Sequence, residues 1–255
     1  MKERINDMNC YVKDAALIEN QEAFYDEYWQ DRHKKLNTSE VERLAEIILA
    51  ISHIKRETGR DQFDICDLGC GVGWLSNELV KFGQVTGVDL SPKGIDIARQ
   101  RWPQVSSFIA HDILSWRPRQ KFDLVVSSEV IEHIPDKRAY AETATYIMKP
   151  GAYFILTTPN GRCKSAWDRG SHGSQLVEEW MTPGELKRLF GRSMTIRSYH
   201  TFEFDSLYTS IFRVTSAPKL LCLLNALKLR SMWDGMRKTF DLGLYQILVA
   251  QYLGT

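Results

Sequence analysis

A glycine-rich run follows a short apolar segment at residues 64–68, and it reads Asp67-Leu68-Gly69-Cys70-Gly71-Val72-Gly73. Alternate glycines permit a tight turn and let a ligand lie against bare backbone. The run is not a dinucleotide fingerprint, because Trp74 or Ser76 takes the place of the third glycine in GxGxxG. It also lacks the Gly-Lys-Ser/Thr ending of a phosphate-binding P-loop. A nucleoside ligand without phosphates therefore fits this run best.

Three aspartates stand at the ends of apolar segments that we expect to be successive strands. Asp89 could accept hydrogen bonds from both hydroxyls of a ribose, and Asp112 could bind an adenine amino group while Ile113 packs on the ring. Asp67 suits an ammonium group near the glycine-rich run. One such aspartate is usually a turn or cap residue, but three at successive strand ends favour a common ligand. Adenine, ribose and a cationic amino-acid tail together describe S-adenosylmethionine.

A hydroxyl that accepts the methyl group of this cofactor must also lose a proton, and two histidines are candidates for the base. His133 follows the expected strand at 122–127, and a histidine is suitable because its unperturbed pKa lies near neutrality. The alternative is that His133 caps or packs beneath the following helix. His172 lies in the later loop Gly170-Ser171-His172-Gly173, where its alternative is a solvated loop histidine.

The segment Glu129-Val130-Ile131-Glu132-His133 also admits a metal hypothesis. If it is helical, the side chains of Glu129, Glu132 and His133 share one face. Two carboxylates and an imidazole suit Mg²⁺ or Mn²⁺. Such an ion would bind the acceptor hydroxyls and lower the pKa of the attacking one.

Strands and helices alternate along most of the chain, and this order must position the residues above. The expected strands are 64–68, 84–89, 107–110, 122–127, 153–158, 196–204 and 245–252. Helical spacing begins at Ser39, an N-cap type, ends near Gly59 and recurs at 74–81, 92–101, 137–147 and 183–190. The alternation predicts βαβ units and a mainly parallel sheet with helices on both faces. Ligands of such sheets lie beyond the carboxyl ends of the strands.

The composition is that of one globular domain with an elaboration. The chain has 255 residues, with 33 lysines and arginines against 32 aspartates and glutamates, and a net charge of +1. This balance excludes intrinsic disorder and argues against a dedicated nucleic-acid binder, which needs a basic excess. Five cysteines without a CxxC pair, a polar start MKERINDMNC and no apolar run of ~18 residues predict a reduced, soluble, cytoplasmic protein.

Four motifs in this order resemble those of the class I S-adenosylmethionine-dependent methyltransferases, especially the ubiquinone-biosynthesis O-methyltransferases and similar small-molecule enzymes. The motifs are Asp67–Gly73, Gly87–Ser91, Phe122–Ile134 and Met148–Ala152, and the resemblance covers about residues 40–160. It implies an α/β fold with a Rossmann-like, doubly wound, seven-stranded sheet and one antiparallel strand at 245–252. The cofactor-binding residues that we expect are Asp67, Gly69, Cys70, Gly71, Gly73, Asp89, Leu90, Asp112, Ile113, Ser128 and Glu129.

The parts outside these motifs should choose the acceptor. We expect a lid segment at 1–38 and a methyltransferase domain at 39–255, with core motifs at 60–160, an acceptor-side loop at 160–182 and a helical insertion at 216–240. The aromatic residues of Phe24–Trp29 resemble those of family lids, and their alternative is core packing. The insertion has a basic amphipathic pattern at 217–240, which suits contact with an anionic membrane or a lipid-like acceptor. The alternative is a lid or dimer helix with its apolar face buried.

The expected function is O-methylation of a small or lipid-like hydroxylated acceptor, with Mg²⁺ as a candidate second cofactor. The resemblance leaves the metal open, because metal-free members carry the same Glu-His pair and often use that glutamate through its backbone. One alternative is a sugar or polysaccharide-end methyltransferase, and another is an RNA-terminal 2′-O-methyltransferase, in which His172 would join the metal ligands. Basic residues around Trp167 are only a modest hint of RNA binding: Arg162, Lys164 and Arg169. The near-neutral net charge favours the alternative, a solvated loop, so nucleic acid is not an expected partner. The last alternative is a catalytically inactive, cofactor-binding regulatory protein.

Overall fold

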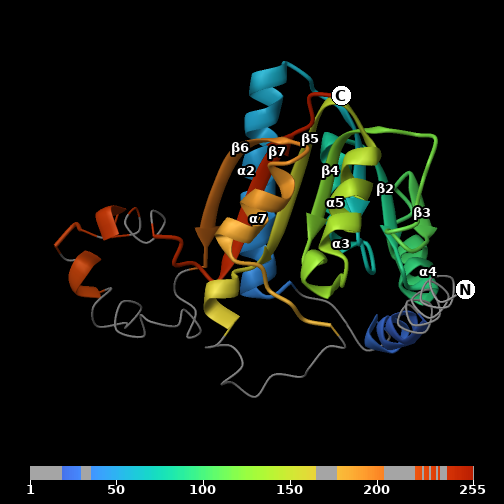
Figure 1. Ribbon diagram of the computed structural model, residues 1–255, viewed down its shortest axis with the longest axis horizontal. Coiled ribbons are helices and arrows are strands. Elements are labelled where there is room, and N and C mark those ends of the chain that lie inside the picture. Colours follow the sequence, from blue (N-terminus) through green and yellow to red (C-terminus); the bar gives the residue numbers. More distant parts are fainter. Residues whose placement is uncertain are drawn as a thin grey trace, which may run out of the picture.

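The computed structural model describes residues 19–29, 36–164, 177–203, 222–225, 227–229, 231–233, 235 and 240–254. At its centre is a seven-stranded sheet in the order β3-β2-β1-β4-β5-β7-β6 (Figure 1). The strands are β1 (Phe63–Leu68), β2 (Gly83–Asp89), β3 (Ser107–Ala110), β4 (Phe122–Ser128), β5 (Met148–Pro159), β6 (Thr195–Phe202) and β7 (Tyr245–Gln251). All neighbouring strands are parallel except β7, which is antiparallel to both β5 and β6. The expected α/β fold with one antiparallel strand is confirmed.

Helices cover both faces of this sheet, as the alternation of strands and helices predicted. They are α2 (Thr38–Thr58), α3 (Trp74–Leu79), α4 (Pro92–Arg101), α5 (Lys137–Tyr146) and α7 (Pro183–Phe190). A further helix spans residues 19–29, and the 3₁₀ turns are η1 (Val80–Phe82), η2 (Ile131–His133) and η3 (Gly161–Cys163). α2, α3 and α4 contribute to one hydrophobic core, and α5 and α7 contribute to the other. Figure 1 shows α2 behind the sheet and α5 and α7 in front of it, so the sheet is doubly wound.

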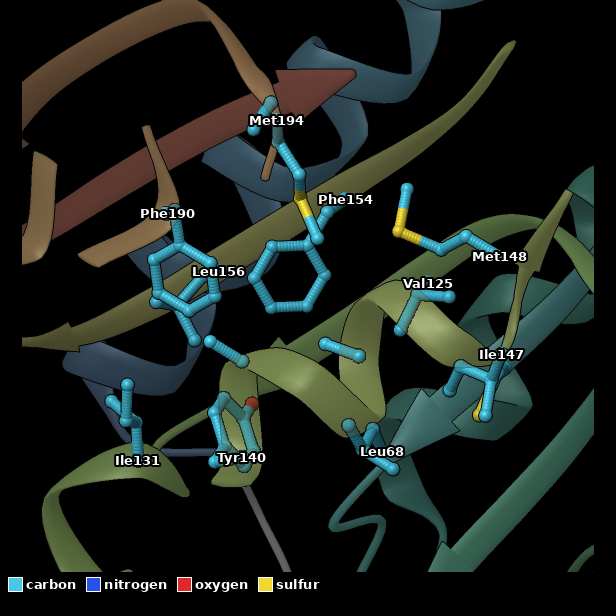
Figure 2. Close-up of a cluster of buried hydrophobic side chains, with 14 of the residues drawn as sticks. Leu68, Val125, Ile131, Tyr140, Ile147, Met148, Phe154, Leu156, Phe190 and Met194 are labelled. Carbon is cyan, nitrogen blue, oxygen red and sulfur yellow. The ribbon is translucent and has the colours of Figure 1, made fainter. Parts of the chain in front are cut away.

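The core on the α5 and α7 face, shown in Figure 2, also fixes the edge of the sheet where the expected site lies. Phe154 of β5 points into this core, and its ring centroid lies 5.0 Å from that of Phe190 on α7. Tyr140 of α5 is fully buried, and its hydroxyl donates to Ser127 Oγ at 2.6 Å. Ser127 Oγ in turn donates to the carbonyl of Leu68 at 2.7 Å. The second bond joins the carboxyl ends of β1 and β4, and the first ties α5 to β4.

Two of the expected regions fall largely outside the described residues. The lid segment is described only at 19–29 and at the start of α2, and the insertion at 216–240 is described only in parts. Within those parts the side chains of Leu223, Leu227 and Met232 are more than half exposed. Among the described helices, none has the length and apolar character needed to cross a membrane. Membrane contact through this insertion stays a prediction.

Candidate functional site

A cavity of about 870 Å³ opens at the carboxyl edge of the sheet. Its walls come from the loops after β1, β2, β3 and β4, from the start of β7, from α2 and from helix 19–29. Small-ligand pockets in proteins usually hold about 300–1,000 Å³. This cavity is near the upper limit, which leaves room for two reactants side by side.

The glycine-rich loop forms one wall of the cavity, because its backbone is tied to β2. The amides of Gly69 and Cys70 both donate to the carbonyl of Val88, at 2.8 and 3.0 Å. Gly69 and Gly71 have φ values of +84° and +52°, the left-handed region that favours glycine. A Cβ on Gly69 would lie 2.3 Å from a methyl of Val130, so only bare backbone fits this turn.

Asp89 joins this loop to the end of β2. Its Oδ2 accepts a hydrogen bond from the amide of Gly71 at 2.7 Å, and its Oδ1 accepts one from the amide of Ser91 at 3.0 Å. The residue lines the cavity, and each carboxylate oxygen has a second acceptor position left. The two backbone bonds therefore fix a carboxylate that can still accept hydrogen bonds from ligand hydroxyls.

Most of the expected cofactor-binding residues line this one cavity: Gly69, Cys70, Gly71, Asp89, Leu90, Asp112, Ile113, Ser128 and Glu129. The Asp112 carboxylate also accepts from the amide of Leu114 at 3.0 Å, which shapes the turn after β3. Ile113 is 6% exposed and belongs to the core, so its side chain is held by packing on the side of the cavity that we assign to the adenine.

Asp67 and Gly73 lie behind the loop and are not among the residues that line the cavity. Gly73 caps the N-terminus of α3 with a φ of +77°. Asp67 is 1% exposed, and its carboxylate accepts from the hydroxyl of Ser76 on α3 at 2.6 Å. The expectation that the Asp67 side chain meets the cofactor ammonium group is therefore corrected. Its carboxylate instead ties α3 to the end of β1.

Burial of Asp67 raises the pKa of its carboxyl group from 3.8 to about 7. Because the folded state holds this proton more tightly than the unfolded state, its contribution to stability is complete below about pH 4 and is lost as the pH rises through 7. The free energy of unfolding of the wild type, relative to that of Asp67→Asn, should therefore fall between pH 4 and 7. The steepest change should be about 1.4 kcal/mol per pH unit. Urea unfolding at several pH values measures this difference.

Asp61→Asn is the matched control for this measurement, because the Asp61 side chain is 92% exposed. The difference in free energy of unfolding between the wild type and Asp61→Asn should stay nearly constant over the same pH range. A constant difference for Asp67→Asn as well would contradict the raised pKa of the buried Asp67 carboxyl group.

Helix 19–29 lies across the cavity and contacts both of its sides. Gln21 Nε2 donates to the carbonyl of His133 at 2.9 Å. On the other side, Asp26 accepts from the hydroxyl of Ser91 and from an amide in the first turn of α4 at 3.2 Å. The aromatic residues that line the cavity from this helix are Tyr25, Tyr28 and Trp29. The sequence left two interpretations of this segment, a lid or core packing, and these contacts agree with a lid over the cavity.

The Glu132 and His133 side chains meet at the turn after β4. Glu132 is 2% exposed, and its Oε2 accepts from Thr158 Oγ1 at 2.9 Å. His133 Nδ1 lies 2.9 Å from the carbonyl of Val177, and its Nε2 lies 3.7 Å from Glu132 Oε1. A carbonyl only accepts, so Nδ1 carries the proton and the neutral ring has a free lone pair on Nε2. Burial raises the pKa of Glu132 to about 7 and lowers the pKa of His133, which keeps the imidazole neutral.

The metal hypothesis does not fit this geometry. The segment from Glu129 to His133 is not one helix, since Glu129 has a φ of +59° and only Ile131–His133 form a 3₁₀ turn. The side chain of Glu129 faces Arg43, with 3.7 Å between Oε2 and the guanidinium, a poor neighbour for a cation. In the part of the chain that the structure describes, no three histidine, cysteine or acidic side chains are grouped so that they could hold a metal ion.

Arg43 and Tyr245 line the cavity and were not found from the sequence. Arg43 shares the buried face of α2 with Ile47, Ile51 and Ile54. The sequence did contain a signal for this buried charge, because Arg43 falls at helical spacing with the three isoleucines. The second candidate base, His172, lies outside the described residues, as do Trp167 and Arg169 of the RNA hint.

The fold and the cavity define a Rossmann-like α/β protein with a nucleoside-type site. Residues 28–201 match the model of a methyltransferase domain. Over 144 residues the chain is 33% identical to a ubiquinone biosynthesis O-methyltransferase of Paramagnetospirillum magneticum, a match that covers 52% of this chain and 57% of that protein. The chain thus spans about half the length of the curated relatives that it matches. It belongs to the methyltransferase-domain family.

Solved structures of low sequence identity share this fold. The N-methyltransferase NodS from Bradyrhizobium japonicum is 17% identical, with a TM-score of 0.56 and coverage of 86% of this chain and 98% of that one. The magnesium protoporphyrin IX methyltransferase from Synechocystis, solved with bound S-adenosylhomocysteine, is 15% identical, with a TM-score of 0.60 and coverage of 92% and 99%.

The residues of the cavity fit the cofactor expected for the family, S-adenosylmethionine. Gly69 and Gly71 line the cavity, and the amino-acid end of the cofactor would lie against their bare backbone. Asp89 would bind the ribose hydroxyls, and Asp112 with Ile113 would hold the adenine.

Proposed function

We propose that the protein transfers a methyl group from S-adenosylmethionine to a hydroxyl oxygen of a small or lipid-like acceptor. The name of the curated relatives, ubiquinone biosynthesis O-methyltransferase, supports a hydroxyl acceptor. The single observation that carries the proposal is that His133 lines the cavity while its Nδ1 donates to the carbonyl of Val177, which leaves Nε2 as the basic nitrogen of the neutral ring. A base in that position is needed for a hydroxyl and gives little advantage to a neutral amine, which already has a nucleophilic lone pair.

The cofactor supplies an electrophilic methyl group on a sulfonium sulfur. The protein's own part is to align two reactants, exclude water with helix 19–29 and remove a proton. His133 Nε2 takes the hydroxyl proton while the new O–C bond forms and the C–S bond breaks. Glu132 Oε1, 3.7 Å away, stabilises the imidazolium until it gives the proton to solvent. The products are a methyl ether, S-adenosylhomocysteine and a proton.

Replacing His133 with alanine should slow methyl transfer by about 10²- to 10⁴-fold, the usual contribution of a general base. The measurement uses methyl-labelled S-adenosylmethionine with a metabolite extract, and the labelled product is identified by mass. His53→Ala is the matched control, because His53 is exposed on α2 away from the cavity lining.

EDTA in the same assay should leave the rate unchanged, because Glu129 faces the Arg43 guanidinium and, among the described residues, no three acidic, histidine or cysteine side chains are grouped to hold a metal ion. A His133→Ala variant with the full rate would exclude His133 as the base. No S-adenosylhomocysteine from the wild type would favour the inactive regulatory alternative instead.

A further inference from the structure

A second hollow lies at the edge of the sheet opposite the cofactor cavity. It is a groove of about 700 Å³ between α5 and the end of α7, two helices that lie side by side in front of the sheet (Figure 1). Lys121 stands directly before β4 and Met148 is the first residue of β5, so the groove lies at the amino ends of these strands. The described residues that line it are all different from those that line the cofactor cavity.

The floor of the groove is the apolar edge of the core beneath it. Ala141 and Met148 are buried members of the core on the α5 and α7 face. Leu189 and Tyr252 pack against the same core and stay partly exposed. A hollow of this volume with a mainly apolar lining is within the range usual for small-ligand pockets, about 300–1,000 Å³.

Positive charge lines the groove and is only partly compensated. Among the described residues that line it, the cations are Lys121, Arg138 and Arg192, and Glu142 is the one acid. Arg138 Nε donates to Glu142 Oε1 at 2.8 Å, so these two charges neutralise each other. Within the described part of the chain, no acidic side chain pairs with Lys121 or Arg192. Two positive charges therefore remain for a ligand.

Both of these cations keep hydrogen-bond donors that a ligand can use. The Lys121 ammonium group lies 3.2 Å from the ring centroid of Tyr146 and donates to the carbonyl of the same residue. An ammonium group has three N–H donors, so this contact holds Lys121 in place without using all of them. Arg192 is exposed, and no described residue accepts a hydrogen bond from its guanidinium. An anion can bind both side chains without displacing an acidic partner.

Uncompensated positive charge beside an apolar floor selects an anion with an apolar body. A cationic ligand would be repelled by Lys121 and Arg192. A wholly polar anion would leave the apolar floor in water, and an uncharged ligand would leave the two cations unused. Tyr146 and Tyr252 both line the groove, and aromatic rings pack well against other rings. A small aromatic anion matches the charge, the floor and the two tyrosines.

We propose that the groove between α5 and α7 is a second ligand site, which binds a small aromatic anion. Lys121 and Arg192 hold the anionic group, and the planar fork of Arg192 can donate to two of its oxygens. The aromatic body lies on Met148, Leu189 and the ring of Tyr252. The site is independent of the proposed methyl transfer, because the two hollows are lined by different residues.

Calorimetry with 2-naphthoate tests this proposal. We expect one binding site with a Kd below about 1 mM, in the absence and in the presence of saturating S-adenosylhomocysteine. The uncharged analogue 2-naphthamide should bind at least about tenfold more weakly. Arg192→Met should weaken 2-naphthoate binding by about tenfold or more, and Lys121→Met should weaken it in the same direction.

Arg188→Met is the matched control, because Arg188 is exposed on α7 and is not among the residues that line the groove. Its affinity for 2-naphthoate should equal that of the wild type. A wild-type Kd above about 1 mM, equal affinity for the acid and the amide, or wild-type affinity in Arg192→Met would overturn the proposal. Loss of 2-naphthoate binding on addition of S-adenosylhomocysteine would overturn it too, because the probe would then bind in the cofactor cavity. The methyl-transfer rate of Arg192→Met should equal that of the wild type, so the proposed function can fail or hold separately.

Discussion

Replacing Asp89 with asparagine is expected to weaken S-adenosylmethionine binding by about 100-fold. The Asp89 carboxylate accepts hydrogen bonds from the amides of Gly71 and Ser91, and an asparagine NH₂ group cannot accept from one of them. The substitution also removes one oxygen that would accept from the ribose. Each hydrogen bond to a charged group contributes about 1.5–3 kcal/mol, and 1.4 kcal/mol is tenfold in affinity. Isothermal titration calorimetry with the cofactor measures the effect.

Asp96→Asn is the matched control for Asp89→Asn. Asp96 lies on α4, where its exposed carboxylate pairs with Arg99 at 3.0 Å. Its cofactor affinity should equal that of the wild type. If Asp89→Asn also binds normally, the assignment of Asp89 to the ribose side of the cavity is wrong.

Replacing Gly69 with alanine is expected to lower both stability and cofactor affinity. The residue has a φ of +84°, which costs an L-amino acid about 1–2 kcal/mol. Its new Cβ would also lie 2.3 Å from Val130, and such overpacking typically costs a further ~1–3 kcal/mol. The loop must move away from β4, so cofactor affinity should fall at least tenfold. Urea unfolding and calorimetry measure the two effects.

Gly151→Ala separates the cost of the positive φ from the cost of the contact with Val130. Gly151 has nearly the same φ, +83°, and a Cβ there meets nothing within 4 Å. This variant should show the backbone cost alone and bind the cofactor as the wild type does. Equal destabilisation of the two variants would mean that the loop has more room than the contact with Val130 allows.

The sheet and the cofactor wall could be predicted from the sequence, because their signals are local. Most strands of the sheet contain a short apolar run, and the glycine spacing after Leu68 marks a turn that accepts only bare backbone. The direction of the Asp67 side chain could also have been predicted from the alternation of residues along its strand. Alternate strand residues share a face, and Ile65 of the same strand packs in the core with α3, so Asp67 had to point toward α3.

The acceptor wall could not be predicted in the same way, because its contacts join distant parts of the chain. The spacing of Glu129, Glu132 and His133 suggested one helical face, but the left-handed backbone at Glu129 breaks that face. The partners that decide their roles are Arg43, Thr158 and Val177, from α2, β5 and a later loop. No periodicity within a segment reveals such pairs.

One measurement tests most directly whether this cavity carries out O-methylation. Wild-type protein is incubated with S-adenosylmethionine carrying a ¹³C methyl group and a metabolite extract, and the labelled product is analysed by NMR together with the S-adenosylhomocysteine formed. We expect the labelled carbon in a methyl ether, in equal amount to S-adenosylhomocysteine, with both lost in Asp89→Asn at cofactor concentrations that saturate only the wild type. A label on nitrogen or carbon, or no S-adenosylhomocysteine above the protein-free control, would contradict the proposal.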